Sequence, residues 1–472
     1  MMGKILLTEA SGYIGSHLKD KLKVNHEIIA ISRNAQNKKN EKNVTWKSAD
    51  LFDLDAITEV MEGIDTAIYL GHSMKTSAKL TQANFEDMDA LLADNVGRVA
   101  KKHGVKHIIF MSGIITNDSH LSLHLKSRLE CEKILRYYGV PVSTLRAGLI
   151  IDSNGSSYPI FKRMIERLPA MILPNWAYNM IEPVSVDDVI DKLAMLVERS
   201  PKENEVFNIT RPKVMNYQEL FERTATIFDK RLSTLHLPTI PIRLSRCWIK
   251  EKMNGEENVK KALKEKQDEQ QIITTKQSKP KSNQNMRDEV KDVRAMTRFR
   301  IPKSYSIQDV TREYAEFINN ITLHLVNGTI NEHEFNIQLP LIRKCILKMK
   351  RDNHDSINEM IVYKIVGGDL AMVKDSGNAR FEFRRILDTN EGIAALQEYE
   401  PTLPWGVYKF TQAIAHKFVM GVFKQHMNHL ASYEKDKPDS VNKIFTNLAM
   451  TTGVMIGACV GTRIYNQVLA KK

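Results

Sequence analysis

Two glycines three residues apart, Gly12 and Gly15, stand where a phosphate-binding turn could form. They follow the short apolar run of residues 5–7, which is typical of a strand covered on both faces, and they precede a helical pattern. In such a strand–turn–helix unit the first of these glycines lets backbone amides approach a pyrophosphate, and the second lets the helix pack closely on the sheet. The residues expected to contact the phosphates are Ser11, Gly12, Tyr13, Ile14 and Gly15.

One position of this fingerprint is altered, because Glu9 stands where its first glycine is usual. The end of the next predicted strand, residues 27–33, meets the adenosine ribose in dinucleotide-binding folds. An acidic residue there would bind the free 2′-hydroxyl of NAD, but Ser32 and Arg33 occupy these positions. A guanidinium suits a 2′-phosphate, so the sequence favours NADP as the cofactor, with NAD as the alternative. Arg33 could also be a solvated side chain without a role in binding.

Further strand-like runs lie at residues 44–46, 66–70 and 106–111, with helical patterns between them. Alternating strands and helices predict an α/β fold with a doubly wound parallel sheet and helices on both faces. Polar and small residues follow two of these strands, where a nucleotide would lie. The residues expected to complete its site are Asp50, Leu51, Gly71 and His72.

The motifs at residues 8–15, 69–74, 124–128, 140–147 and 182–188 together resemble the atypical and extended short-chain dehydrogenases/reductases. They look like a branch similar to the NAD(P)-dependent epimerase/dehydratase proteins. The resemblance covers about the first half of the chain, and it implies a Rossmann-type sheet that binds NAD(P).

The same resemblance implies where catalysis would occur. Catalytic members use a tyrosine, a lysine four residues later and a serine on the preceding strand; the matching positions are His124, Arg128 and Ser112. Only the serine is retained. Histidine can exchange a proton near neutral pH, whereas arginine supplies only fixed charge and donors, here to hold the nicotinamide ribose.

Two functions follow from these replacements. One is an oxidoreductase that transfers hydride at a carbonyl or conjugated double bond, with a rewired proton-transfer site. The other is a non-catalytic nucleotide-binding redox sensor or membrane-associated assembly factor. A nucleotide-sugar epimerase or dehydratase is disfavoured because the tyrosine–lysine pair is missing. The substrate is expected to be a small molecule, with an apolar one as an option.

The chain divides by composition into four segments: a nucleotide-binding domain at 1–247, a charged helix and linker at 248–292, an α+β domain at 293–435 and a tail helix at 440–472. The third segment resembles an uncharacterised C-terminal domain of the same branch, which has a helix-grip, SRPBCC-like shape. The matching stretches are residues 285–293, 367–370, 379–384 and 403–408. A curved sheet on a long helix, here at residues 408–430, can enclose an apolar ligand.

One strand-like stretch of this segment alternates charged and aromatic residues. The two kinds of side chain must lie on opposite faces, so we expect a solvated charged face over a packed apolar one. The charged residues are Arg380, Glu382 and Arg384, and the aromatic ones are Phe381 and Phe383.

The chain has 472 residues and a net charge of +12, yet no nucleic-acid recognition pattern accompanies that charge, so no nucleic-acid partner is expected. Four scattered cysteines and no signal-peptide pattern indicate the cytoplasm, and no metal site is expected. Residues 444–462 carry no charge and repeat glycine every fourth residue, at Gly453, Gly457 and Gly461. This tail could associate with a membrane, pack on the protein or form an oligomer contact; the oligomeric state stays open.

Overall fold

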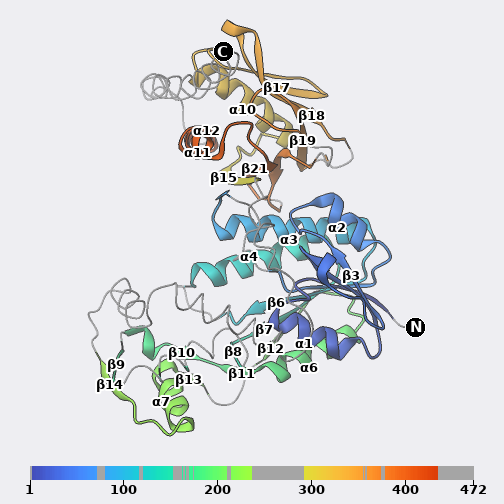
Figure 1. Ribbon diagram of the computed structural model, residues 1–472, viewed down its shortest axis with the longest axis vertical. Helices are drawn as coiled ribbons and strands as arrows, with labels where there is room; N and C mark the ends of the chain where they lie inside the picture. Colours follow the sequence, from blue (N-terminus) through green and yellow to red (C-terminus); the bar gives the residue numbers. More distant parts are fainter. Residues whose placement is uncertain are drawn as a thin grey trace, which may run out of the picture.

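The computed structural model shows two packed parts, with the N-terminal part below and the C-terminal part above in Figure 1. The structure describes residues 3–71, 80–115, 121–152, 170–173, 175–209, 214–236, 292–353, 359–373, 378–387 and 389–433, with the single residues 162, 165 and 356. His72, the linker before residue 292 and the tail at 440–472 lie outside these ranges, so the predictions made for them are not addressed.

A seven-stranded parallel sheet forms the centre of the N-terminal part. Its strands are β1 (Lys4–Leu7), β2 (Glu27–Ser32), β3 (Val44–Ser48), β4 (Thr66–Tyr69), β6 (His107–Gly113), β7 (Val142–Ala147) and β12 (Glu205–Ile209). Their order is β12-β7-β6-β4-β1-β2-β3, and every neighbouring pair is parallel. The predicted Rossmann-type doubly wound sheet is therefore confirmed.

Helices cover both faces of this sheet. On one face α1 (Tyr13–Leu22) and α6 (Val186–Val197) share a core with the strands, in which Leu18 and Leu193 are fully buried. On the other face lie α2 (Leu54–Met61), α3 (Phe85–Lys102) and α4 (Leu123–Tyr137). Near full burial of both sheet faces explains why the strands read as continuous apolar runs.

A smaller lobe extends from the carboxyl edge of the parallel sheet (Figure 1). It contains three two-stranded pairs and the helix α7 (Tyr217–Ile227), which packs near the 3-10 helix η2 (Asn175–Tyr178). The paired strands are β8 (Leu149–Ile151) with β11 (Pro183–Ser185), β9 (Ala170–Leu173) with β14 (Ser233–His236), and β10 (Met180–Ile181) with β13 (Met215–Asn216).

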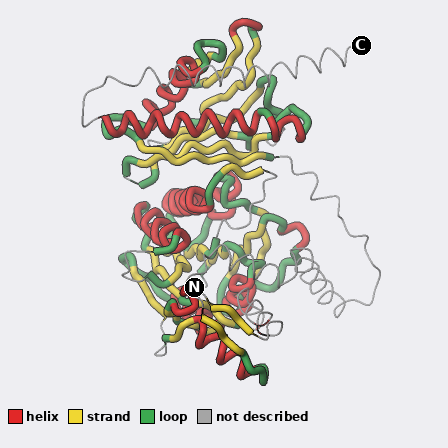
Figure 2. Tube along the Cα trace, turned by 90° about the vertical axis from the view of Figure 1, so that its left-hand side faces the viewer, coloured by secondary structure: helices red, strands yellow, loops and turns green. Residues whose placement is uncertain are grey.

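The C-terminal part is built on a second sheet, in the order β16-β17-β18-β19-β20-β21-β15-β5. Two long helices, α10 (Ile307–Ile321) and α12 (Gln412–Tyr433), lie on one face of it, and the short α11 (Trp405–Phe410) precedes α12. Figure 2 shows a long helix lying against the strands of this sheet. The strands are β15 (Val293–Arg300), β16 (Asn327–Ile330), β17 (Glu334–Leu339), β18 (Lys344–Arg351), β19 (Met360–Gly367), β20 (Arg380–Arg385), β21 (Glu391–Tyr399) and β5 (Leu80–Gln82). The helix-grip assignment itself stays a prediction.

The two parts share one hydrophobic core and one sheet edge. Strand β5, which belongs to the N-terminal half of the sequence, adds in parallel to β15 at the edge of the second sheet. The face of that sheet opposite α10 and α12 packs on α3, and apolar residues such as Met296 and Val362 join the core of the N-terminal part. Among the helices of the described residues, none is both long and apolar enough to cross a bilayer.

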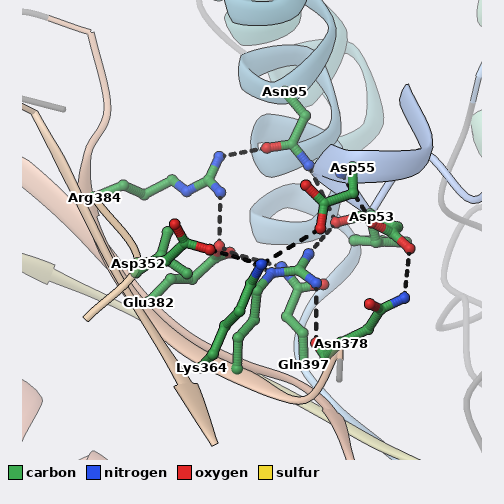
Figure 3. A network of polar contacts seen from close by, with 12 residues as sticks. Asp53, Asp55, Asn95, Asp352, Lys364, Asn378, Glu382, Arg384 and Gln397 are labelled. Atoms are coloured by element: carbon green, nitrogen blue, oxygen red, sulfur yellow. Dashed lines mark hydrogen bonds and ion pairs between the residues drawn. The ribbon is translucent and has the colours of Figure 1, made fainter. Parts of the chain in front are cut away.

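The charged face of β20 differs from the sequence expectation. Arg380, Glu382 and Arg384 are not solvated; they are 3%, 0% and 0% exposed, because this face of the sheet is pressed against α3. Figure 3 shows Arg384 reaching Asn95 of α3 above Glu382. The alternation was predicted correctly, but its polar side is an interface between the two parts.

Candidate nucleotide site

A pocket of about 100 Å³ opens at the carboxyl ends of β1, β2, β3 and β4. In doubly wound sheets this is where the strand order reverses and where ligands bind. The sequence predicted several of its walls, namely Ser11, Ser32, Arg33, Asp50, Leu51 and Gly71. Its full lining is Glu9, Ser11, Ile31, Ser32, Arg33, Ala49, Asp50, Leu51, Phe52, Gly71 and Leu92. The structure thus brings together residues from four separate loops.

The glycine turn at the start of α1 requires its glycines. A Cβ on Gly15 would lie 2.1 Å from the Glu9 carbonyl oxygen, and one on Gly12 would lie 3.0 Å from the same atom. Gly12 is the N-cap of α1, and no side chain caps the helix. The helix therefore begins at Tyr13 with amide groups directed beyond its end, which is the arrangement that binds phosphates.

Glu9 occupies a backbone conformation that usually calls for glycine. Its φ is 52°, in the left-handed region, and its side chain is exposed and lines the pocket. One carboxylate oxygen, Oε2, lies 4.0 Å from the position that a Cβ on Gly12 would take. A negative charge therefore lies over the turn where a pyrophosphate is expected, and it opposes phosphate binding.

Side chains of the C-terminal part contact the pocket wall formed by residues 49–52 and the adjoining Asp53. Arg294 of β15 is 1% exposed; its Nη2 lies 3.2 Å from Asp50 Oδ2, and its guanidinium lies 3.9 Å from the centre of the Phe52 ring. Arg380 of β20 donates to the Phe52 carbonyl, and Asn378 donates to Asp53 at 2.9 Å. Sequence reasoning missed these contacts because the partners are hundreds of residues away.

A carboxyl with an unusual pKa lies beside this wall. Burial raises the pKa of Glu398, on β21, to about 7. Asp53 and Asp50 act in the same direction, whereas the guanidinium groups of Arg380 and Arg294 oppose the rise. The interface therefore holds a carboxyl that changes charge near neutral pH.

We expect Glu398→Gln to remove part of the pH dependence of stability. Because the pKa of Glu398 is higher in the folded state than its ordinary value of 4.5, protonation stabilises the fold. This contribution to stability is complete below about pH 4.5 and is lost as pH rises through about 7. Wild type should lose on the order of 2 kcal/mol relative to the variant between pH 5 and pH 8. Urea unfolding of both proteins at both pH values measures this; identical pH dependence would contradict it.

Arg128, predicted to hold a ribose, is engaged in the protein. It is 5% exposed, Nη1 donates to the Gly71 carbonyl at 3.0 Å and Nη2 donates to the Met111 carbonyl. Its guanidinium also lies 4.4 Å from the centre of the Phe110 ring. These contacts join the ends of β4 and β6, so Arg128 positions the floor of the site.

Ser112 and His124 lie on consecutive elements, at the end of β6 and in the first turn of α4. Ser112 is 6% exposed, and its hydroxyl has no hydrogen-bond partner among the described residues, which leaves it available to a ligand. His124 is largely exposed. Partial burial of its ring and the nearby charge of Arg128 lower its pKa, so the imidazole is neutral at pH 7.

The N-terminal part has a fold of the Rossmann type, and a stretch of it matches one known protein family. Residues 10–165 match a family described as NAD(P)H-binding. The match contains the glycine turn, the walls of the pocket and the Ser112–Arg128 stretch. It does not extend to the C-terminal part. Residues 10–165 of the N-terminal part are therefore similar to proteins of an NAD(P)H-binding family.

Two curated relatives each match about 30% of the chain. The auxiliary protein GraX of Staphylococcus aureus is 35% identical over 147 residues, which are 30% of this chain and 44% of that protein. The uronate dehydrogenase of Pseudomonas putida is 30% identical over 152 residues, 29% of this chain and 50% of that protein. The chain thus spans about half the length, or less, of these relatives.

The similarity to solved structures extends over about 50% of the chain. MoeE5, in complex with UDP-glucuronic acid and NAD, is 18% identical, with a TM-score of 0.42 over 50% of this chain and 86% of that one. A nucleoside-diphosphate-sugar epimerase from Staphylococcus aureus is 16% identical, with a TM-score of 0.43 over 50% of this chain and 80% of that one. Similarity at this level gives no information about the activity of this protein.

Proposed function

We propose that this protein binds NADP(H) in the pocket at the ends of β1 to β4 and uses it for hydride transfer to or from a carbonyl or conjugated double bond. The observation that carries the proposal is the convergence of Ser11 from the glycine turn, Arg33 and the 49–52 wall on one cavity. Ser11 and the amides at the start of α1 would hold the pyrophosphate, and Arg33 would meet the 2′-phosphate.

When bound, the cofactor would supply or accept the hydride. The chain supplies the groups for the remaining chemistry. The hydroxyl of Ser112, which has no hydrogen-bond partner within the described ranges, would donate a hydrogen bond to a substrate oxygen. His124, neutral at pH 7, would accept the proton of an alcohol during oxidation and return it during reduction. Arg128 would act as a positioning residue through the carbonyls of Gly71 and Met111.

Arg33→Ala should lower the affinity for NADPH about tenfold and leave that for NADH nearly unchanged. The reason is that a charge-assisted contact to the 2′-phosphate is lost, and NADH lacks this group. Calorimetric titration of wild type and variant with both nucleotides measures the effect, with the exposed Lys39→Ala as the matched control. An equal loss for both nucleotides, or tighter NADH binding by wild type, would contradict the NADP assignment.

A second candidate, a non-catalytic redox sensor, is favoured by the state of Arg128. Its guanidinium is 5% exposed and is held by two backbone carbonyls and an aromatic ring, so it is positioned by the protein itself and not directed at a ribose. A screen of carbonyl and enone substrates with NADPH separates the candidates. The oxidoreductase predicts turnover that falls at least a hundredfold in His124→Ala. Tight NADPH binding without turnover on any of them would favour the sensor.

A further inference from the structure

A second cavity lies inside the C-terminal part, between its sheet and the helices α10, α11 and α12. Its volume is about 180 Å³. It lies on the face of the second sheet that α10 and α12 cover, and it shares no lining residue with the nucleotide pocket. Its walls are Tyr314, Ile318, Ile321, Thr322, Val326, Ile337, Ile346, Leu347, Leu370, Phe381, Leu396, Tyr399, Tyr408, Gln412, Ala415, His416 and Val419.

The cavity contains an unsatisfied amide. Gln412 begins α12, is 8% exposed and lines the cavity, and neither its Nε2 nor its Oε1 has a hydrogen-bond partner among the described residues. Burying such a group without a partner is destabilising. A buried amide kept at the wall of an apolar cavity indicates a hydrogen-bonding ligand.

Another polar side chain of the lining lies one helical turn from Gln412. His416 also lines the cavity, and burial lowers its pKa to about 4, so its imidazole is neutral at physiological pH. None of the lining residues carries a charge at that pH. A charged ligand head would therefore be desolvated without a counter-charge, whereas a hydroxyl or carbonyl could exchange hydrogen bonds with the amide.

Exposed apolar side chains adjoin the lining residues along the chain. Leu323 and Leu325 are 58% and 44% exposed and lie between the lining residues Thr322 and Val326 in the chain. Phe410 and Ile414 stand on either side of Gln412 and are 71% and 48% exposed. These side chains provide apolar surface next to the cavity, along which an apolar ligand could enter.

We propose that this cavity binds an uncharged apolar molecule with a single hydrogen-bonding group, such as a medium-chain alcohol or ketone, and that Gln412 holds that group. The site is independent of the proposed nucleotide chemistry, because it shares no lining residue with the nucleotide pocket.

The test uses the full chain and the neutral fluorescent probe N-phenyl-1-naphthylamine, displaced by 1-octanol, 1-chlorooctane or octanoate. Wild type should bind the probe saturably and prefer octanol to each of the other two by about tenfold, the value of one good hydrogen bond or one uncompensated charge. Ala415→Trp, which fills the cavity, should abolish probe binding. Gln412→Leu should remove the preference for octanol over chlorooctane.

Gln412→Leu should also raise the midpoint of thermal unfolding by a few degrees without ligand, because it removes an unsatisfied buried amide. The exposed Gln338→Leu is the matched control and should change neither property. Three results would overturn the proposal: no saturable probe binding by wild type, unchanged binding by a folded Ala415→Trp, or an octanol preference that survives in Gln412→Leu.

Discussion

Replacing Arg384 by methionine should destabilise the protein by about 3–5 kcal/mol. Arg384 is fully buried at the junction of the two parts. Its Nη1 lies 2.7 Å from both Asp94 Oδ2 and Asn95 Oδ1 of α3, and its Nη2 lies 3.0 Å from Glu382 Oε2. Burial alone would raise the pKa of Asp94, but Arg98 and Arg384 outweigh it and hold that pKa below its usual range. Without Arg384, Glu382 and Asp94 would be buried charges with too little compensation.

Denaturant unfolding of wild type and Arg384→Met measures this effect. Arg312→Met is the matched control, since Arg312 is exposed and forms a surface pair with Asp309; it should change stability by less than about 1 kcal/mol. Adding Glu382→Gln to Arg384→Met should recover part of the loss, because it removes one of the stranded carboxylates. A loss no greater than that of Arg312→Met would show that the network does not stabilise the junction.

Glu9→Gly should increase the affinity for NADPH ten- to a hundredfold. The carboxylate lies over the turn that would receive the pyrophosphate, and removing a like charge a few ångströms from phosphates is worth about 1–3 kcal/mol at the effective dielectric of a protein surface. Glycine also adopts the φ of 52° without strain. A more mobile unfolded chain offsets that gain, so stability should change by less than about 1 kcal/mol.

Glu9→Gln separates charge from backbone, because it keeps the side-chain size and the strained φ. We expect it to reproduce most of the affinity gain. Titration at two salt concentrations strengthens the test, since the advantage over wild type should shrink at high salt. Weaker binding by both variants would mean that Glu9 contributes to the nucleotide site.

The sequence was sufficient to predict features that depend on local pattern. Apolar runs predicted the parallel strands, because a strand covered on both faces has no polar side. The spacing of Gly12 and Gly15 located the turn, and residue order along a doubly wound sheet placed Ser32, Arg33 and Asp50 on one pocket. The arrangement of these residues follows from connectivity, which the chain specifies directly.

The features that the sequence did not predict depend on contacts between residues far apart in the chain. Arg294 meets Asp50 across 244 positions, and β5 joins a sheet made almost wholly of residues after 292. An alternating charged strand looks the same whether water or a second domain covers it, which explains the incorrect expectation for Arg380, Glu382 and Arg384. The pattern shows which side chains share a face but not what that face contacts.

These contacts connect the nucleotide pocket with the C-terminal part. Arg380 of strand β20 donates to the carbonyl of Phe52, a residue of the nucleotide pocket wall, and the next residue, Phe381, lines the apolar cavity. Adjacent residues of one strand thus point to opposite faces and reach both sites. The resulting arrangement gives the second sheet a structural role in shaping the first pocket.

Hydrogen exchange with and without saturating NADPH tests the central claim most directly, namely that the pocket at the ends of β1 to β4 is the dinucleotide site. We expect NADPH to slow amide exchange at residues 11–15 and 49–52, the phosphate-binding turn and the wall held by Arg294. Binding that leaves both segments unprotected, or no binding at millimolar NADPH or NADH, would contradict the claim.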